Sequence, residues 1–287
     1  MRYRFVRRYA VVAALLLWFV TGSNAQHLEV GLFGGASNFR GDVGPDNFSG
    51  FLGETHPAFG VLARYNFGDF ISLQAHVING TISGNDSKSN DPALRLRDMT
   101  FRSTIWDFGG QLEWNIMGYQ PYALNRTFSP YIFVGFVGYH SDPQGKRGDT
   151  WVDLQPLGTE GQGLPGYKTP YSLWGVAIPA GVGVKYALND LWNLGFEIGV
   201  RKTFDDYLDD VGGKYVQYET LLTAKGDNAA YFGNRQHAGE GGTRGNNSDK
   251  DWYGFMGITI TYNFLDNGLV GARFRQRGRN GCKSANF

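Results

Sequence analysis

The sequence contains a single cysteine, Cys282, in 287 residues. One thiol cannot form a disulfide within the chain, so Cys282 is either a spectator or pairs with another chain. Histidine is almost as scarce, with five residues. For His56 and His140, sequence spacing arranges no serine or carboxylate beside the ring, which gives little support to catalysis by a serine–histidine pair.

Long hydrophobic runs are also missing. After residue 25, no segment approaches the roughly 18–20 continuous apolar residues that a membrane-spanning helix needs. The one marked run, Ala10–Val20, follows four arginines and precedes the small residues Ser23–Ala25. This order is typical of a secretory signal peptide. We therefore expect residues 1–25 to be removed and the mature chain to begin at Gln26, outside the cytoplasm, where nucleic acid is not an expected partner.

Glycine and aromatic residues, in contrast, are abundant, with 42 glycines and 15% aromatic residues. The mean hydropathy is −0.32, a value that usually indicates a water-soluble protein. Membrane-spanning β-barrels escape this rule because only every second residue of a strand faces lipid. The composition is therefore compatible with such a barrel.

Eight segments alternate apolar and polar residues with the period of two that is typical of β-strands. Within Ser103–Met117, for example, Trp106 and Trp114 belong to an apolar face, and Asp107 and Glu113 belong to a polar face. Every such strand must bury one of its faces. The eight segments are 27–36, 57–67, 70–82, 101–116, 129–140, 172–187, 191–203 and 252–264.

The connections between these segments alternate in length, with the long loops on one rim and the shorter turns on the other. Outer-membrane barrels have this arrangement, with short periplasmic turns and longer extracellular loops. The sequence therefore predicts an all-β fold, an eight-stranded antiparallel up-and-down transmembrane β-barrel with long extracellular loops, over residues 26–264. An even strand number places both termini in the periplasm, together with a basic tail at 265–287.

A soluble barrel or sandwich would show the same periodicity but bury the apolar face. Three features favour lipid outside. The polar faces are rich in glycine, as a narrow lumen requires, and aromatic residues flank the apolar stripes as interfacial girdles do. The charges on the polar faces nearly balance, so that they can pair inside a lumen. This predicted luminal network consists of Glu29, Asp107, Glu113 and Glu197 with Arg64, Lys185 and Arg201.

The loops and the tail hold the remaining charged clusters. Asp205, Asp206, Asp209 and Asp210 are acidic enough to suggest a Ca²⁺ site, but the spacing of an EF-hand is absent, and turn carboxylates or pairing with nearby lysines and arginines explain them as well. The tail is either a solvated extension or an electrostatic handle for an acidic partner or lipid headgroups. Its basic residues are Arg273, Arg275, Arg277, Arg279 and Lys283.

Two further patterns are weak. His56 and His140 lie near the predicted outer rim, where a surface hydrolase would place a base, and His76 is expected to be a hydrogen-bonded luminal residue. The tripeptide Arg40–Asp42 reads RGD, which is a poor indicator of adhesion on a glycine-rich loop.

Several strings, taken in order, resemble the PorG family of outer-membrane barrels, which belongs to the type IX secretion and gliding machinery of Bacteroidetes. They are EVGLFGGASNFRGDVG, FRSTIWDFGGQLEWN, SPYIFVGFVGYHSDP, TEGQG, TFDDYLDDVGGKY and RGNN, within residues 28–264. The resemblance implies a non-enzymatic role without cofactors. It also implies association with the periplasmic ring of PorK and PorN, and with other subunits of the machinery. The loop signatures it marks are Thr159, Glu160, Gly161, Asp206, Asp209 and Asp210.

The sequence thus predicts an outer-membrane barrel that anchors the periplasmic PorK–PorN ring, with membrane lipid and ring proteins as its partners. Two alternatives stay open at this stage. One is a structural barrel like OmpA, or a surface adhesin, and the other is a hydrolase at the outer rim.

Overall fold

The computed structural model describes residues 28–44, 53–121, 126–246 and 250–264. Within them, eight long strands form a closed antiparallel β-barrel, and a ninth strand, β6, is short. The strands are β1 (Leu28–Arg40), β2 (His56–Asn66), β3 (Ile71–Asn85), β4 (Thr100–Asn115), β5 (Phe128–Arg147), β6 (Thr150–Asp153), β7 (Trp174–Ala187), β8 (Trp192–Thr203) and β9 (Trp252–Phe264).

Each barrel strand pairs with its neighbour in the chain, and β1 pairs with β9 to close the sheet, from Leu28 opposite Phe264 to Arg40 opposite Trp252. The strand β5 pairs with β7 rather than with β6 inside the barrel. The β6 strand only forms a hairpin with the last four residues of β5. The predicted eight-stranded antiparallel up-and-down barrel is therefore confirmed.

The structure differs from the prediction in the loops. The strand β5 continues to Arg147, seven residues beyond the predicted end at 140, and β6 was not predicted. Three short helices, α3 (Pro92–Arg97), α4 (Tyr218–Lys225) and α5 (Asp227–Asn234), and two 3-10 turns at Asp86–Lys88 and Gln155–Leu157 also lie in predicted loops. Apart from the longer β5, each of these elements has eight residues or fewer. They are therefore too short to show a long periodic pattern.

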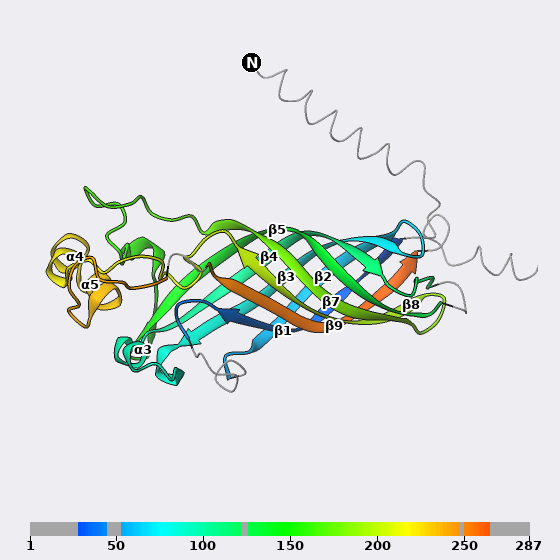
Figure 1. Cartoon of the computed structure of the whole chain (residues 1–287), viewed down its shortest axis with the longest axis horizontal. Helices are drawn as coiled ribbons and strands as arrows, with labels where there is room; N and C mark the ends of the chain where they lie inside the picture. Colours follow the sequence, from blue (N-terminus) through cyan, green and yellow to red (C-terminus); the bar gives the residue numbers. More distant parts are fainter. Residues whose placement is uncertain (1–27, 45–52, 122–125, 247–249, 265–287) are drawn as a thin grey trace, which may run out of the picture.

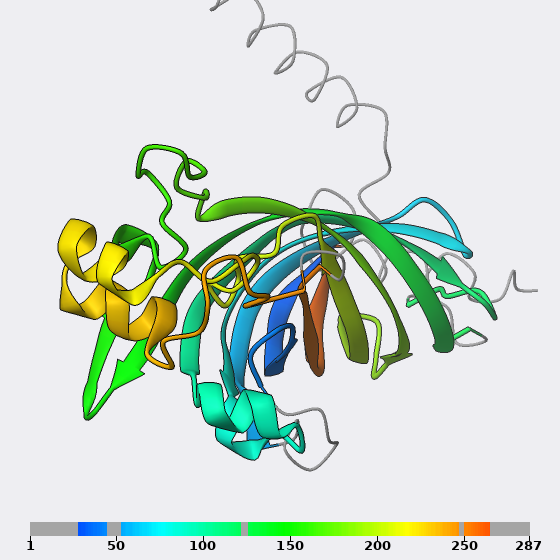
Figure 2. The same cartoon turned by 60° about the vertical axis from the view of Figure 1, so that its left-hand side comes forward.

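Figures 1 and 2 show that the three helices lie at one end of the barrel, with α4 and α5 beside the β5–β6 hairpin and apart from α3. The connections at this end, which we call the loop end, are 41–55, 86–99, 148–173 and 204–251. At the opposite end, the turn end, the connections are 67–70, 116–127 and 188–191. The predicted segregation of long loops from short turns is thus present.

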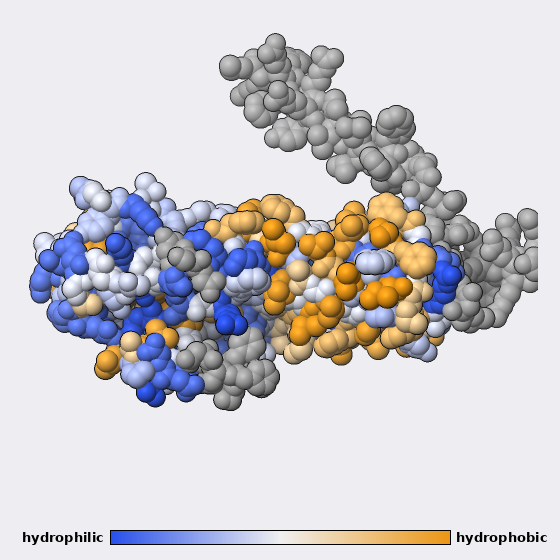
Figure 3. All heavy atoms as spheres, viewed as in Figure 1, coloured by the Kyte–Doolittle hydropathy of each residue, from blue (hydrophilic) through white to orange (hydrophobic). Residues whose placement is uncertain are grey.

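The outer surface of the barrel carries a continuous apolar belt. In Figure 3 the hydrophobic residues gather over the half of the barrel next to the turn end, and the loop end is hydrophilic. Among the described residues, no helix is both long and apolar enough to cross a membrane. Exposed residues of the belt include Val61, Leu73, Val77, Phe108, Leu112, Ile132, Val134, Ile178, Val182, Leu194, Phe196, Ile198, Ile258 and Ile260.

Large aromatic side chains flank this belt. Trp106 and Trp174 lie on its side toward the loop end, and Trp114, Tyr186 and Trp192 lie on its side toward the turn end, all exposed. The outward row of β7 from Trp174 to Tyr186 covers about 40 Å along the strand at about 3.3 Å per residue. A tilt of about 45° reduces this to about 28 Å, close to the hydrocarbon thickness of about 30 Å.

The polarity of the two faces reverses along the strands. On β4, the inward side chains change from buried Asp107 near the belt to buried Ile105 and Phe101 toward the loop end. The outward side chains change from Trp106 to exposed Arg102. The pairing registers continue through this point without a slip. Near the turn end the inner face of the barrel is therefore polar and the outer face apolar. Toward the loop end the inner face is apolar and the outer face polar.

An apolar core fills the barrel toward the loop end. Phe39, Phe101 and Ile82 are buried in it, and the loop residues Val43 and Leu208 belong to the same cluster. The loops therefore close this mouth of the barrel by hydrophobic packing. We call this closed assembly of loops the cap.

Candidate functional site

The interior near the turn end is centred on the buried guanidinium of Arg64. Its Nη1 donates to Glu29 Oε2 at 2.9 Å, its Nη2 donates to Gln74 Oε1 at 2.6 Å, and its Nε lies 2.9 Å from Glu113 Oε2. Glu29 accepts further hydrogen bonds from Asn66 and Thr261. The cation is thus surrounded by acceptors from three strands, β1, β3 and β4, as a buried charge requires.

Glu113 is shared between two cations. It pairs with Arg64 and also accepts from Nζ of Lys185, which in turn donates to Asn115 Oδ1 at 2.9 Å. The ammonium of Lys185 also lies 4.5 Å from the centre of the Tyr131 ring, at cation–π distance. Glu113 is fully buried, so both cations depend on it.

A second polar layer lies further along the barrel. Asp107 contacts His76 Nε2 at 2.6 Å, accepts from the Tyr253 hydroxyl at 2.8 Å and lies 3.5 Å from Arg201 Nε. Glu197 accepts from Gln111 at 3.0 Å and from the Tyr131 hydroxyl at 2.9 Å. The structure thus places all seven of the predicted luminal residues inside the barrel, each buried.

These contacts span the lumen. Asp107 on β4 and Tyr253 on β9 belong to strands on opposite sides of the barrel in the strand order. Glycine makes room for the large side chains, because a Cβ at Gly181 or Gly199 would come within 2.5 Å of the Phe133 ring. An eight-stranded barrel has an interior just wide enough for side chains, and here they fill it with ion pairs and rings rather than leaving a channel.

The cap joins the loop strings that the sequence analysis singled out. Glu160 Oε1 accepts from the backbone N–H groups of Gly212 and Gly213, at 3.1 and 2.9 Å. The same oxygen accepts from Arg244 Nη1 at 2.8 Å. Glu160 therefore binds the TEGQG string to the DDVGG string, and Arg244 of the RGNN string completes its neutralisation.

Asp210 makes a second connection between the same loops. Its carboxylate accepts from Thr159 Oγ1 at 2.5 Å and from the Tyr171 hydroxyl at 2.7 Å. Arg244 donates to the Asp210 backbone oxygen at 2.6 Å and lies 3.5 Å from its carboxylate. Burial raises the pKa of Asp210 to about 6, an effect opposed by Arg244. The guanidinium of Arg244 is thus the hub of the cap.

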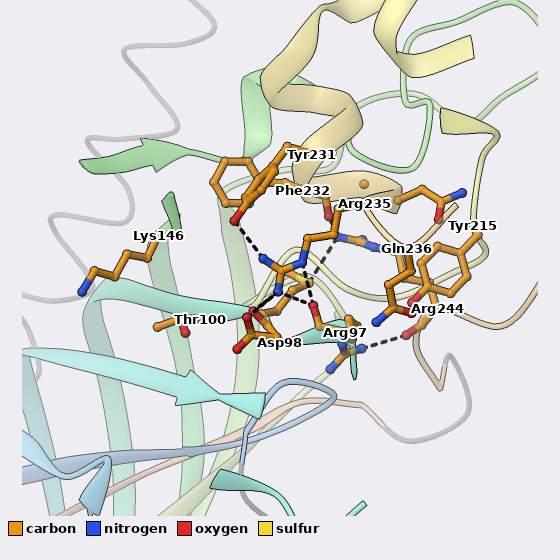
Figure 4. Close-up of a pocket in the computed structure, with 13 residues that line it drawn as sticks. Arg97, Asp98, Thr100, Lys146, Tyr215, Tyr231, Phe232, Arg235, Gln236 and Arg244 are labelled. Atoms are coloured by element: carbon orange, nitrogen blue, oxygen red, sulfur yellow. Dashed lines mark hydrogen bonds and ion pairs between the residues drawn. The ribbon is translucent and has the colours of Figure 1, made fainter. Parts of the chain in front are cut away.

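Two more arginines attach the short helices to this hub. Arg97 of α3 pairs with Asp86 and donates to the backbone oxygens of Asp42 and Arg244. Figure 4 shows Arg235, which follows α5, pointing toward the Arg97–Asp98 backbone and toward the Tyr231 hydroxyl. These residues line a cavity of about 10 Å³, which is too small for a ligand larger than a water molecule.

The predicted Asp-rich loop lies within the cap, and its carboxylates brace the backbone. Asp209 accepts from the N–H groups of Val43 and Val211, both at 2.9 Å, and Asp251 accepts from that of Leu208 at 3.0 Å. Among the described residues, no three His, Cys, Asp or Glu side chains gather closely enough to hold a metal ion. Asp205 and Asp209 therefore act as turn carboxylates in this structure, since both accept from nearby backbone N–H groups.

Burial raises the pKa of several of these aspartates. The pKa of Asp206 rises to about 7, with Lys250 opposing the shift and Asp42 adding to it. Burial also raises the pKa of Asp209, helped by Asp42, and that of Asp251, helped by Asp209. A carboxyl with a raised folded-state pKa stabilises the fold below its unfolded pKa of about 3.9, and this stability is lost as the pH rises through the folded value.

We therefore expect the cap to loosen as the pH rises from about 5 to about 8, the range that brackets the pKa of Asp206. Hydrogen exchange of residues 204–246 at matched intrinsic rates measures this. The Asp206→Asn variant is expected to show a flatter pH dependence because it removes one titration. A cap equally protected at both pH values would contradict the raised pKa values.

The described histidines give no support to a hydrolase at this rim. A serine does lie beside His56 in space, with Ser83 Oγ 2.7 Å from His56 Nε2, although the two residues are 27 positions apart in the sequence. Ser83 donates its hydroxyl proton to Glu54, so His56 must act as the donor to Ser83, the reverse of a general base. His140 lies 3.6 Å from the Asp142 carboxylate and packs its ring edge against Trp174 at the border of the belt.

The RGD tripeptide is not a free loop. Arg40 ends β1, and both carboxylate oxygens of Asp42 accept from the N–H of Asn246, at 3.0 and 2.9 Å. This engagement in the cap gives no support to the adhesive interpretation of the tripeptide.

Some predictions lie outside the described residues. They are the signal peptide at 1–25, His27, Cys282 and the basic tail with Arg273, Arg275, Arg277, Arg279 and Lys283. No sequence pattern indicated Arg97, Arg244, Tyr131 or Tyr253 as site residues, although RGNN contains Arg244. A single arginine in a long loop carries no periodic signal, so its burial could not be read from the sequence.

Solved structures with a similar fold have little sequence identity. Neisserial surface protein A is 8% identical, with coverage of 83% of this chain and 97% of that chain and a TM-score of 0.41. Ail of Yersinia pestis is 8% identical, with coverage of 83% and 98% and a TM-score of 0.40. OprG from Pseudomonas aeruginosa is 11% identical, with coverage of 84% and 100% and a TM-score of 0.36. No functional statement follows from these likenesses.

No curated protein matches the sequence. A protein-family profile, however, matches residues 7–155 and 166–272, which include every barrel strand. The chain therefore belongs to the family described as "Domain of unknown function (DUF6089)".

Proposed function

We propose that this protein is a non-enzymatic anchor in the bacterial outer membrane, and that it ties the PorK–PorN ring of type IX secretion to that membrane. The apolar belt faces lipid, the loop end faces the exterior, and the turn end faces the periplasm. A closed barrel satisfies every strand's backbone groups in lipid. The proposal for the ring depends on the sequence resemblance to PorG.

One observation carries the anchoring role, the lumen filled with paired charges behind an apolar outer surface. Transport requires a continuous path through the barrel, but Glu113 pairs with both Arg64 and Lys185 within this lumen. Catalysis by a serine–histidine pair requires the histidine to accept the serine proton, but the proton of Ser83 is directed to Glu54 and not to His56. These features favour a barrel that holds a position in the membrane and binds partners at its ends.

The membrane position has its own test. Val182 is 51% exposed in the middle of the outward row of β7. We expect Val182→Arg to destabilise the barrel folded in vesicles by about 2–4 kcal/mol. The matched control is Thr104→Arg, an exposed outward residue of β4 beyond the belt, which is expected to change the stability of the barrel by less than about 0.5 kcal/mol. Equal effects, or a variant pair soluble without detergent, would contradict the lipid-facing belt.

The ring-binding role is tested by deleting residues 265–287. We expect the truncated barrel to remain in the membrane and to shift on heating in gel electrophoresis, because its strands are intact. Ring proteins co-purified after crosslinking should fall at least about tenfold, which corresponds to about 1.4 kcal/mol of lost affinity. Unchanged recovery of the ring would refute the contribution of the tail.

A full-length variant separates charge from length in this test. It replaces the five basic residues of the tail by glutamine. Loss of the ring in both variants supports electrostatic binding, and loss in the deletion alone assigns the contact to other tail residues. The five residues are Arg273, Arg275, Arg277, Arg279 and Lys283.

A surface-binding role, as in an adhesin, is the second candidate because the cap encloses a cavity. Such a role predicts that changes in the cap abolish function while the ring is still recovered. The proposed anchoring role predicts the converse.

A further inference from the structure

A cavity of about 620 Å³ opens in the cap between the loop that follows β5 and the loop that precedes β9. Its volume lies in the range of small-molecule sites, about 300–1,000 Å³. Tyr167, Tyr207 and Tyr215 line it, together with Glu160 and Gln162. It therefore offers aromatic surface and polar groups on the side of the barrel away from the proposed ring.

The polar groups at its base are buried and retain bonding capacity. Gln162 is 2% exposed, and its Oε1 accepts from the Glu160 N–H at 2.9 Å, but its Nε2 has no hydrogen-bond partner among the described residues. Within the same described part of the chain, Glu160 Oε2 accepts from the Tyr207 hydroxyl alone, at 3.2 Å, although a carboxylate oxygen can accept two hydrogen bonds. The Gln162 amide can thus donate a hydrogen bond to a ligand, and the Glu160 carboxylate, two residues earlier in the chain, can accept one.

One of the lining tyrosines, Tyr207, is held in place before any ligand arrives. The Tyr207 ring stacks on Tyr171 with centroids 4.6 Å apart and planes at 5°. Tyr171 in turn donates to Asp210, which links it to the hub of the cap. A site with fixed aromatic walls loses little conformational freedom when it binds a ligand.

Two glycines of the loop strings keep the cavity open. A Cβ at Gly213 would approach Glu160 Oε2 to 2.6 Å, so a side chain there would displace the carboxylate at the base. Gly161 has φ +76, and a Cβ on it would approach the Tyr167 ring to 2.7 Å. Glycine meets both demands, the close approach and the left-handed conformation.

The charge of the cavity excludes several ligand classes. Glu160 is neutralised by Arg244 at 2.8 Å, so a cation gains little from it. The second lining carboxylate, Glu240, is exposed to solvent and accepts from the Tyr167 hydroxyl at 3.1 Å. A phosphate would meet the Glu160 carboxylate at the base, because Lys168 and Lys214 line only exposed parts of the cavity. An extended peptide cannot bind here by adding a strand to a sheet edge, because the lining residues belong to loops.

We propose that this cavity binds a short saccharide, with Tyr207 and Tyr215 packing against sugar rings and with Gln162 and Glu160 bonding to hydroxyl groups. Each hydroxyl both donates and accepts, which matches the unpaired amide donor and the carboxylate acceptor. Aromatic walls and neutral hydrogen-bonding groups together suit a ligand that is apolar on its ring faces and polar at its edges.

The test uses the full chain in lauryldimethylamine oxide, a detergent without a sugar headgroup. Saturation-transfer NMR with maltotriose and with tri-N-acetylchitotriose is expected to show transfer to the protons of at least one of them at millimolar concentration. The tripeptide Ala-Ala-Ala and methyl phosphate, whose methyl protons report transfer, should show none. Transfer to the tripeptide alone, or to methyl phosphate alone, would overturn the assignment, and so would the absence of transfer to both sugars.

Three variants locate the signal. Tyr207→Ala and Gly213→Ala are expected to weaken binding by about tenfold or more, and Tyr207→Phe should keep part of the affinity because it retains the ring. Tyr186→Ala, at the opposite end of the barrel, is the control and should bind as the parent does. Heat-shifted electrophoresis checks that each barrel is folded. Unchanged binding in both Tyr207→Ala and Gly213→Ala would overturn the site.

Discussion

Replacing Glu113 by glutamine is expected to lower the barrel's free energy of unfolding by about 3–5 kcal/mol. Glu113 is 0% exposed and serves both Arg64 and Lys185, which are 2% and 1% exposed. Without its charge, Lys185 keeps only uncharged partners among the described residues, including the amide oxygen of Asn115 and the Tyr131 ring, and Arg64 keeps Glu29 as its ionic partner. Removing one partner of a buried pair leaves the other charge uncompensated, which is the costly change.

Urea unfolding of the barrel in vesicles, followed by tryptophan fluorescence, measures this loss. The control is Asp98→Asn, which neutralises a carboxylate that is 58% exposed beside Arg235 and should cost no more than about 1 kcal/mol. The double variant Glu113→Gln with Lys185→Met should recover part of the stability because it removes one orphaned cation. A cost for Glu113→Gln as small as the control's would mean that water, and not Glu113, solvates the two cations.

Replacing Arg244 by methionine is expected to open the cap while the barrel stays folded. The side chain is 1% exposed and bonds to Glu160, to the Asp210 backbone and to the Phe232 backbone. Its loss leaves two buried carboxylates without a cation, at a local cost of about 3–5 kcal/mol. Hydrogen exchange and limited proteolysis should show faster opening of residues 204–246, with the strands still protected.

Arg147→Met is the matched control because this arginine is 34% exposed and pairs with an Asp227 that is 61% exposed. We expect its effect on exchange to stay below the equivalent of about 1 kcal/mol. Arg244→Lys should give an intermediate result, since an ammonium supplies the charge but not the planar fork of donors. Protection of the cap in Arg244→Met equal to that in Arg147→Met would remove the guanidinium as its hub.

The barrel could be predicted from the sequence because its pattern repeats. On β7, for example, Val182 and Val184 alternate with Gly183 and Lys185, and the other predicted strands alternate in the same way. Eight such segments joined by alternately long and short loops indicate a closed barrel. The extension of β5 to Arg147 and the short α4 and α5 could not be predicted. Their apolar residues pack locally, as Val216, Leu221 and Ala230 do, and such short elements are too brief to show a period.

The candidate site divides in the same way. The identities of the luminal residues follow from strand alternation, because a charge on the polar face must point inward. Their partners do not follow, since the contact of Lys185 with Glu113 joins residues 72 positions apart. The apolar interior toward the loop end was also not predicted. Ile78 and Ile82 continue the inward row of β3, but they are apolar where the earlier residues of that row are polar.

That reversal of polarity along β3 and β4 has a consequence for how deep the protein sits. The crossover between Ile105 and Trp106 therefore fixes how deep the barrel lies in the membrane. A shift in one direction would expose outward apolar residues to water, and a shift in the other would bring Arg102 into the hydrocarbon. The height of the cap above the lipid surface is then a fixed dimension of the molecule, independent of any partner. Adding two residues to every strand beyond that crossover would move the cap further from the membrane and leave the depth of the apolar belt unchanged.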